Sequence, residues 1–497
     1  MRRLCSLFVI FVLLCCCAGC GFHEDYGPSA LDSQPSPEGS QPDHRLSTGL
    51  GDAAIWLDKS DEPWGRRESR IYVLPNGDEF HQIRLSFNSE AEETEVVLDS
   101  LLLPDTATMR RYSQESQQWF ASPLGEGQIS GGQYHISHEE GSLLLVSPQS
   151  YLPRENQMLQ YLPQSDGYFR SRPAEKGWQL ELCSPVYPGA QVECFYALSG
   201  EQLVDWQDSV AQELWANYDF TGDNRWCYDG YYYLAPENYI PSGENYYHRL
   251  SAAYIASQCA EKEGRICFDL ALPMLHVMLG LQNDQGYFPT LAGSQWLLTD
   301  YGIGAGFYDT RFNSDLVEAL LIMNERFHVP EFADAAMRYG QYYQSMAEKN
   351  HYALNAGADA ETDAGADDSA WLVWDYAYEG CQPNHSSLNH QIAEILVLYR
   401  LYDLTGYEDY EDLANTLLRG ILALGKRWLL PNNDLAYAYL PDASLGMQDY
   451  PYLTYNDLFD LCQALDQRYG SHDPLLDQLM SGKRQWMDKQ GISGYKK

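Results

Sequence analysis

The sequence predicts a multidomain α+β fold in which an all-β sandwich or barrel precedes an α/α toroid, that is, an incomplete α/α barrel. The chain has 497 residues, more than one compact core usually holds. Its first part contains short runs that alternate apolar and polar residues, and its second part has apolar residues three and four apart. We therefore expect four segments, at residues 1–20, 21–62, 63–203 and 204–497.

Residues 1–20 have the pattern of a lipoprotein signal peptide. MRRLCSLFVIFVLLCCCAGC contains two early arginines, an apolar run and then small residues. The run is shorter than the roughly 20 residues that span a membrane. Cys17-Ala18-Gly19-Cys20 resembles a bacterial lipobox, although Cys17 stands where Leu is usual. We expect acyl chains on Cys20 to anchor the protein to the membrane on the extracytoplasmic side, the alternative being an ordinary signal peptide or a short anchor.

Residues 21–62 are predicted to be a flexible linker. The stretch HEDYGPSALDSQPSPEGSQPDHRLSTGLGD is rich in Pro, Ser, Gly and Asp and has no hydrophobic period. Such a composition buries too little apolar surface to offset the entropy lost on ordering. We expect this linker to hold a globular body away from the membrane.

Residues 63–203 carry a β pattern. Its alternating runs include SRIYVLP, HQIRLSFN, TEVVLDSLLL, GSLLLVSP, WQLELCSP and QVECFYAL. Turn-forming residues separate these runs about every ten positions, a spacing typical of a sandwich or barrel.

Cysteine usage predicts at most a few disulfides and no metal site. Five of the 12 cysteines lie in the first 20 residues, which leaves seven in the body of the chain. The predicted compartment permits disulfides, and Cys183 and Cys194 flank the turn-like SPVYPGAQVE, so they are placed to pair. An odd number leaves at least one free thiol. The seven show no Cys-x-x-Cys spacing, so we expect no bound metal.

From residue 204 the period becomes helical. Helical spacing occurs in DSVAQELWANY, YYHRLSAAYIASQCAEKEG, ICFDLALPMLHVMLGLQ, SDLVEALLIMNERF, PEFADAAMRYGQYYQSMAE, SLNHQIAEILVLYRLYDLTG, YEDLANTLLRGILALGKRWL and LTYNDLFDLCQALDQRYG. Many of these begin with Pro or Asp or end with Gly, as helices do. Successive helices with no strands between them predict antiparallel hairpins packed as a toroid. The acidic run NAGADAETDAGADDSA is predicted to be a solvated loop.

The charge of the chain excludes one class of partner. The formal net charge is −38, which disfavours binding to nucleic acid because phosphates require a basic face.

Three long segments between strong helices are rich in aromatic residues. They span residues 285–313, 374–389 and 434–456, and each contains several tyrosines. Connections in compact domains usually need only about 4–6 residues. Because alternate loops of a toroid gather at one mouth, three such loops predict a binding groove.

The helical half resembles the C-terminal domain of the D-glucuronyl C5-epimerases. The resemblance rests on LQNDQGYFPT, GAGFYDTRFNSDLVEALL, SSLNHQIAEILVLYRLYDLTG and MQDYPYLTYNDL, which follow the family's order over roughly residues 240–470. The family inverts carbon 5 of glucuronate residues within a polysaccharide. This chemistry needs a base on one face of the sugar ring, an acid on the other and donors that stabilise the charge between them. Tyrosine suits these roles, and no metal or cofactor is expected.

The resemblance implies a set of site residues. The expected catalytic residues are Tyr450, Tyr378, Glu379 and Tyr439. The expected substrate-binding residues are Arg311, as a clamp for the substrate carboxylate, with Tyr308, Asn313, Asn389, Tyr437 and Asp449. The family's Arg after the loop tyrosine is absent here, because Tyr439 is followed by Leu440, Pro441 and Asp442.

Two alternatives from other functional classes remain open at this point. One is a glycoside hydrolase or polysaccharide lyase on the same scaffold, with carboxyl groups from Asp309, Asp375, Glu379 or Asp449. The other is a non-catalytic glycan-binding lipoprotein. In each case we expect a carbohydrate partner, a uronate-containing polysaccharide for the epimerase, and a homodimer is possible.

Overall fold

The computed structural model of the chain describes residues 41–354 and 370–497. Cys20, the signal sequence and all but the last residue of the acidic run lie outside these residues. The described residues form two compact units. The larger body contains residues 41–342 and 377–382, and the smaller body contains residues 343–354, 370–376 and 383–497.

The larger body is built on an antiparallel sheet of 13 strands in the order β1-β2-β3-β4-β14-β10-β11-β18-β16-β15, with β9, β6 and β7 added beside β10. The strands of this body are β1 His44–Thr48, β2 Gly51–Glu62, β3 Gly65–Val73, β4 Glu79–Phe87, β5 Glu95–Leu103, β6 Thr108–Ser113, β7 Gln118–Pro123, β8 Gly127–Ile129, β9 Gln133–His138, β10 Gly141–Pro153, β11 Leu159–Tyr161, β12 Tyr168–Pro173, β13 Trp178–Pro185, β14 Gln191–Ser199, β15 Asn224–Cys227, β16 Gly230–Leu234, β17 Tyr239–Ile240, β18 Tyr246–Arg249, β19 Gly293–Ser294 and β20 Tyr308–Asp309.

A second sheet covers one face of the large sheet. Its strands run in the order β5-β13-β12-β8. Leu85 and Leu145 of the large sheet belong to the same buried cluster as Phe169 and Leu182 of the small one. Alternation of apolar and polar residues along each strand produces this shared core, because only every second side chain points inward. The prediction of an antiparallel β region before the helices is confirmed in this general form.

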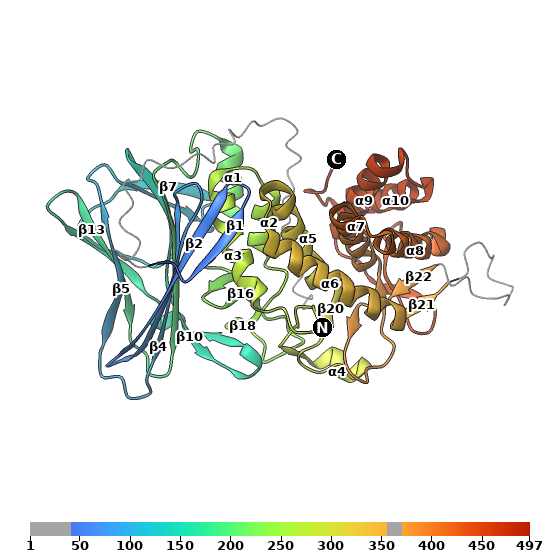
Figure 1. The fold of residues 1–497 in the computed structure, drawn as a ribbon, viewed down its shortest axis with the longest axis horizontal. Coiled ribbons are helices and arrows are strands. Elements are labelled where there is room, and N and C mark those ends of the chain that lie inside the picture. Colours follow the sequence, from blue (N-terminus) through green and yellow to red (C-terminus); the bar gives the residue numbers. More distant parts are fainter. Residues whose placement is uncertain (1–40, 355–369) are drawn as a thin grey trace. The chain divides into compact units, whose positions relative to one another are not determined.

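Helices cover the opposite face of the large sheet. Figure 1 shows α3 beside the strands, and Tyr72 of β3 makes the contact, with its hydroxyl 2.8 Å from Nδ1 of His276. The helices of the larger body are α1 Ser209–Asn217, α2 Tyr254–Glu261, α3 Arg265–Leu279, α4 Gln295–Tyr301 and α5 Thr310–Phe327, and α6 Pro330–Lys349 ends in the smaller body. A helical C-terminal part is therefore confirmed. No helix of the described residues is long and apolar enough to cross a membrane.

The expectation that no strands lie among the helices is wrong. Strands β15 and β16 form a hairpin after α1, and β18 joins them to β11 of the large sheet. The hairpin turns at Tyr228 and Asp229, followed by Gly230, which adopts φ 139°. Asp-Gly is a strong hairpin signal, but the flanking strands have only four or five residues and show too little alternation to stand out.

The predicted linker, residues 21–62, is wrong over its second half. Residues 44–62 form β1 and β2, which pair with each other, and β2 pairs with β3 along its length. Leu46, Ala53 and Ile55 are buried, so this stretch contributes to the core. The Pro- and Ser-rich composition that predicts a linker belongs to the residues before it.

The predicted disulfide between Cys183 and Cys194 does not form. Cys183 lies on β13 of the small sheet and Cys194 on β14 of the large sheet, so the turn between them connects two sheets rather than one hairpin. Both are free and buried, and Cys194 Sγ donates a hydrogen bond to Val146 O at 3.2 Å. All seven cysteines of the described residues are free thiols.

The smaller body consists of helical hairpins with short strands. Its helices are α7 Leu388–Thr405, α8 Glu408–Leu424, α9 Leu453–Tyr469 and α10 Pro474–Gln490, and its strands are β21 His351–Ala353, β22 Trp371–Val373, β24 Ser386–Ser387, β25 Ala436–Tyr439 and β26 Leu445–Gln448, with β23 Tyr376–Ala377 at the division. Gly406 ends α7 and Gly470 ends α9, both in the left-handed conformation that favours glycine. Gly420 of α8 lets the helix approach β22, because a Cβ there would lie 1.9 Å from Trp371 O.

A buried polar network joins the sheet to α3 in the larger body. Arg265 Nε donates to Asp78 Oδ2 at 2.5 Å, and Asn76 Nδ2 donates to both Asp78 Oδ2 and Asp269 Oδ1. Asp78 and Asp269 are fully enclosed. Burial, followed by the charge of Asp78, raises the pKa of Asp269 well above its usual range.

We expect Asp269→Asn to stabilise the larger body at pH 8 and to change its stability little at pH 4. Because the pKa of Asp269 is raised, the folded state binds a proton at this carboxyl more tightly than the unfolded chain does. This proton binding contributes its full stability at a pH below the pKa of Asp269 in the unfolded chain. The contribution is lost as the pH rises through the pKa of Asp269 in the folded protein. Asn keeps the acceptor for Asn76 and needs no proton. Urea unfolding at both pH values measures the effect, with exposed Asp284→Asn as the matched control. An equal loss of stability at pH 4 and pH 8 would contradict the assignment.

Candidate functional site

The first aromatic loop of the larger body is held in place by residues that the sequence assigns to substrate binding. Asn313 is fully buried: its Nδ2 donates to Phe288 O and Asp309 O, and its Oδ1 accepts from Phe288 N at 2.7 Å. Tyr308 is also enclosed, with its hydroxyl 2.7 Å from that of Tyr339. These contacts make Asn313 and Tyr308 supports of the loop rather than groove-lining residues.

The predicted carboxylate clamp, Arg311, lies in the first turn of α5. Its Nε donates to Asp315 Oδ1 at 2.7 Å, one turn further along the helix. Asp309 caps the same helix by accepting a hydrogen bond from Phe312 N at 3.0 Å. The i,i+4 pair therefore orients the guanidinium of Arg311, and Asp315 offsets part of its charge.

Tyr378 and Glu379 are exposed in the larger body. The Tyr378 hydroxyl lies against Gly304, where a Cβ would come within 2.8 Å of it. Tyr378 has 40% of its surface exposed, and Glu379 is also exposed. Both have the accessibility that contact with a substrate requires.

The centre of the smaller body is a buried carboxylate, Asp375. Its Oδ1 accepts from Ser387 N at 2.7 Å, and its Oδ2 accepts from the Ser387 hydroxyl. His385 Nε2 lies 3.2 Å from Oδ2 and His390 Nδ1 lies 3.6 Å from it. Ser387 is the N-cap of α7, so the positive end of the helix dipole also faces this carboxylate.

The surroundings of Asp375 keep it ionised. Burial alone would raise its pKa, but His390, His385 and the hydrogen bonds outweigh burial, and the pKa lies below its usual range. An ionised carboxylate beside an imidazole fixes the ring's orientation and tautomer, which is how proteins prepare histidine for proton transfer. His385 is completely enclosed, so its orientation is well fixed.

Tyrosines surround this pair and lead to a partly exposed phenol. The ring of Tyr376 packs edge-on against His385 at 5.5 Å between centroids, and Tyr437 lies 6.1 Å from the same imidazole. Tyr450 packs edge-on against Tyr437 at 5.7 Å and is only partly buried. The predicted residues Tyr437 and Tyr450 are therefore brought together, in a series that begins at Asp375 and reaches Tyr450.

Two other predicted residues of the smaller body are less accessible. Tyr439 is 8% exposed, packs against Tyr352 at 5.2 Å, and has a pKa raised by burial. Asn389 is 1% exposed in the first turn of α7. Both side chains are buried, so neither presents an open surface to a substrate.

A buried lysine fixes the backbone of Tyr450. Lys483 Nζ lies 2.6 Å from Asp449 Oδ2, donates to Asp434 Oδ1 at 2.6 Å and donates to the Tyr450 carbonyl at 2.7 Å. Asp449 also accepts from the Thr454 hydroxyl at 2.6 Å. Burial raises the pKa of Asp449 to about 6, although Lys483 opposes the shift. This pairing assigns Asp449 to positioning Tyr450 rather than to contacting the substrate.

The site residues expected from the sequence include neither these two histidines nor Lys483. His385 and His390 flank the N-cap of α7 five residues apart, and Asp375 lies only ten residues before His385, so a local signal for this cluster exists. No local sequence signal marks Lys483. It lies on the apolar face of α10, where the pattern predicts a core residue, and its partners Asp434 and Asp449 come from the segment before α9. The residues that the structure describes include no group of three or more His, Cys, Asp or Glu that could hold a metal ion.

No family model matches the sequence, and no curated protein matches it. Among solved structures, cellobiose 2-epimerase from Spirochaeta thermophila aligns at 11% identity over 48% of this chain and 59% of its own, with a TM-score of 0.33. A D-mannose isomerase aligns at 12% identity over 47% and 58%, with a TM-score of 0.34.

A family 76 glycoside hydrolase from a bovine Bacteroides thetaiotaomicron strain aligns at 8% identity over 87% of this chain and 77% of its own, with a TM-score of 0.34. This chain spans about three fifths of the length of the epimerase and the isomerase. All three names are those of carbohydrate-active enzymes. At these TM-scores the likeness decides neither the reaction nor the substrate.

We expect Lys483→Met to destabilise the smaller body by about 3–5 kcal/mol at pH 8. The substitution leaves Asp434 and Asp449 enclosed without their cation. The loss should shrink toward pH 5, because protonation removes the unpaired charges. Urea unfolding followed by circular dichroism measures it.

The matched control is Lys489→Met, which makes the same change on an exposed position of α10 and should alter stability by no more than about 0.5 kcal/mol. Equal effects at the two positions would show that the buried lysine is not required.

Proposed function

We propose that this protein is an isomerase that inverts carbon 5 of glucuronate residues in a polysaccharide. The observation that carries the proposal is the cluster of Asp375, His385, Tyr437 and Tyr450, in which the carboxylate lies 3.2 Å from His385 Nε2 and the three rings pack against one another in turn. This packing fixes the position of the partly exposed Tyr450 phenol, and a phenol held in place at the surface suits an enzyme that transfers a proton to its substrate.

The proposed reaction balances without an oxidant or cofactor. A base removes the proton from carbon 5, and the electron pair of the C–H bond moves into the carboxylate to form an enediolate. A donor on the other face of the ring returns a proton to the same carbon. Because the intermediate carries a second negative charge, neutral phenols and a cation near the carboxylate lower the barrier.

Each residue has a role in this proposal. In the smaller body, Tyr450 is the proposed proton carrier and Tyr437 lies beside it. The roles expected from the sequence for Tyr378, Glu379 and Arg311, which lie in the larger body, stay predictions. Asp375 and Lys483 are positioning residues, since one fixes His385 and the other fixes the Tyr450 backbone.

Hydrolysis is less well supported by the smaller body. A glycosidase needs two carboxyl groups that reach the scissile bond. Asp375 is enclosed and shared among Ser387 and two histidines, and Asp449 is enclosed with Lys483. Neither is placed to protonate a leaving group.

The proposal extends to the rest of the chain as the sequence predicts it. We propose that the helices complete an α/α toroid and that Cys20 carries a lipid anchor on the extracytoplasmic side of the membrane. The substrate would then be a polysaccharide outside the cytoplasm.

The test is hydrogen exchange at carbon 5. The full chain is incubated in deuterated water with heparosan, a polymer that contains glucuronate, and the products are read by NMR and mass spectrometry. We expect deuterium at carbon 5, and we expect Tyr450→Phe to slow its incorporation by at least about a hundredfold because the phenol proton is lost. Asp375→Asn should lower kcat and shift the pH profile while leaving KM nearly unchanged.

Tyr407→Phe is the matched control. It removes the same hydroxyl group from a tyrosine that is 64% exposed, precedes α8 and lies outside the cluster. Chain shortening without exchange would move the protein to the hydrolases. An unsaturated sugar end would identify a lyase. If the products show no exchange, no shortening and no unsaturated end, an enzymatic role on this substrate is refuted.

A further inference from the structure

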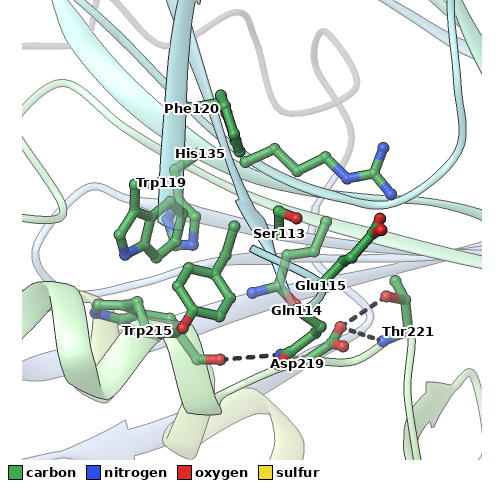
Figure 2. A pocket seen from close by; sticks show the side chains of 13 residues that line it. Ser113, Gln114, Glu115, Trp119, Phe120, His135, Trp215, Asp219 and Thr221 are labelled. Atoms are coloured by element: carbon green, nitrogen blue, oxygen red, sulfur yellow. Dashed lines mark hydrogen bonds between the residues drawn. The ribbon is translucent and has the colours of Figure 1, made fainter. Parts of the chain in front are cut away.

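The larger body contains a cavity of about 550 Å³ that the proposed reaction does not use. It lies between the β6–β7 hairpin, strand β9 and the segment that ends α1 and follows it (Figure 2). Its volume falls within the roughly 300–1,000 Å³ of small-molecule sites. All of its lining residues belong to the larger body.

Aromatic side chains form much of the cavity wall. Trp119 lies in the lining with Tyr112, whose ring is 5.3 Å from it, and with Trp215. Phe120 also belongs to the lining and is 57% exposed, and as the next residue of β7 it points to the face opposite Trp119. Exposed aromatic rings at a concave site mark a place where a ligand replaces water.

The remaining lining is polar and, on balance, acidic. Glu115 and Gln114 stand at the turn of the hairpin, and Asp219 lies opposite them (Figure 2). Asp219 Oδ1 accepts from Thr221 N and from its hydroxyl, both at 2.7 Å, which fixes the carboxylate. Arg111, the cation of this lining, donates to Ser130 and to the Tyr134 hydroxyl.

His135, in the cavity wall, would lower the stability of the fold if its role were packing alone. His135 is 3% exposed, and its Nε2 is enclosed with no hydrogen-bond partner among the described residues. Its ring packs edge-on against Trp119 and Trp215 at 5.6 and 5.2 Å. Burial and then Arg110 lower its pKa to about 3, so the ring is neutral. A core built for stability would place phenylalanine here, because an unpaired buried nitrogen costs free energy.

We propose that this cavity binds a neutral hexose residue of an oligosaccharide. A pyranose has apolar C–H faces that stack on aromatic rings and hydroxyls that donate to carboxylate and amide oxygens. Trp119 and Tyr112, which share one face of the hairpin, supply the rings, and Asp219 and Glu115 supply acceptors. An anionic sugar fits less well, since Arg111 is already engaged and the chain has a net charge of −38. This site is independent of the proposed reaction in the smaller body.

The test is calorimetric titration of the full chain with three neutral probes, the hexamers of glucose (β-1,4), mannose (β-1,4) and N-acetylglucosamine (β-1,4). We expect at least one probe to bind, and we expect Tyr112→Ala to weaken its binding about tenfold because a stacking surface is lost. Tyr187→Ala is the matched control, an exposed aromatic of the same body outside this lining, and it should leave binding unchanged.

His135→Phe separates a binding role from a structural one. It should leave the unfolding midpoint equal or higher, because the unpaired nitrogen is gone, and should still weaken binding. Unchanged binding in both Tyr112→Ala and His135→Phe would overturn the proposal. So would binding of none of the three neutral probes, or binding only of an acidic hexamer of heparosan.

Discussion

The cost of enclosing a charge governs how both bodies of this protein are assembled. A charged group taken out of water destabilises the fold by several kcal/mol unless other groups pair with it. Arg265, Asp375 and Lys483 are three such groups, and each is paired with residues from another part of the chain. The pairs therefore fix sheet against helix in the larger body and loops against helices in the smaller one. Lys483 also holds the backbone of Tyr450 by donating to its carbonyl, and so helps to position the Tyr450 phenol.

Much of the secondary structure could be predicted because periodicity reports which face of an element is buried. The long alternating runs became strands and the helical runs became helices, except that YYHRLSAAYIASQCAEKEG begins with strand β18 and is helical only in α2. Short elements were missed for the same reason, since β15 and β16 are too short to show a period. The early strands β1 and β2 were hidden because a composition averaged over the Pro-rich segment obscured the buried Ala53 and Ile55. The partners of Cys183 and Cys194 depend on which sheet each strand joins, and spacing along the chain does not contain that information.

The candidate site was predictable in its aromatic residues and not in its charges. Loops that carry many tyrosines are visible in a sequence, and Tyr437 and Tyr450 do lie together. The same reasoning placed Asn313 in a groove, although it holds the backbone of Phe288. A residue's type shows what chemistry it can perform, whereas burial decides whether a ligand can reach it. The pairing of Asp375 with His385 arises only when the segment before α7 folds back on itself.

The large sheet also sets where the chain can be divided. Strands β18, β16 and β15, which follow α1 in the sequence, extend this sheet beyond β11. A fragment that stopped at residue 203 would leave the amide and carbonyl groups of β11 unpaired along an open edge. Open edges of this kind recruit strands from other molecules and lead to aggregation. Residues through Arg249 complete the pairing of β11 but still lack Arg265, the partner of buried Asp78, so a recombinant fragment meant to represent the β region needs to extend through α3.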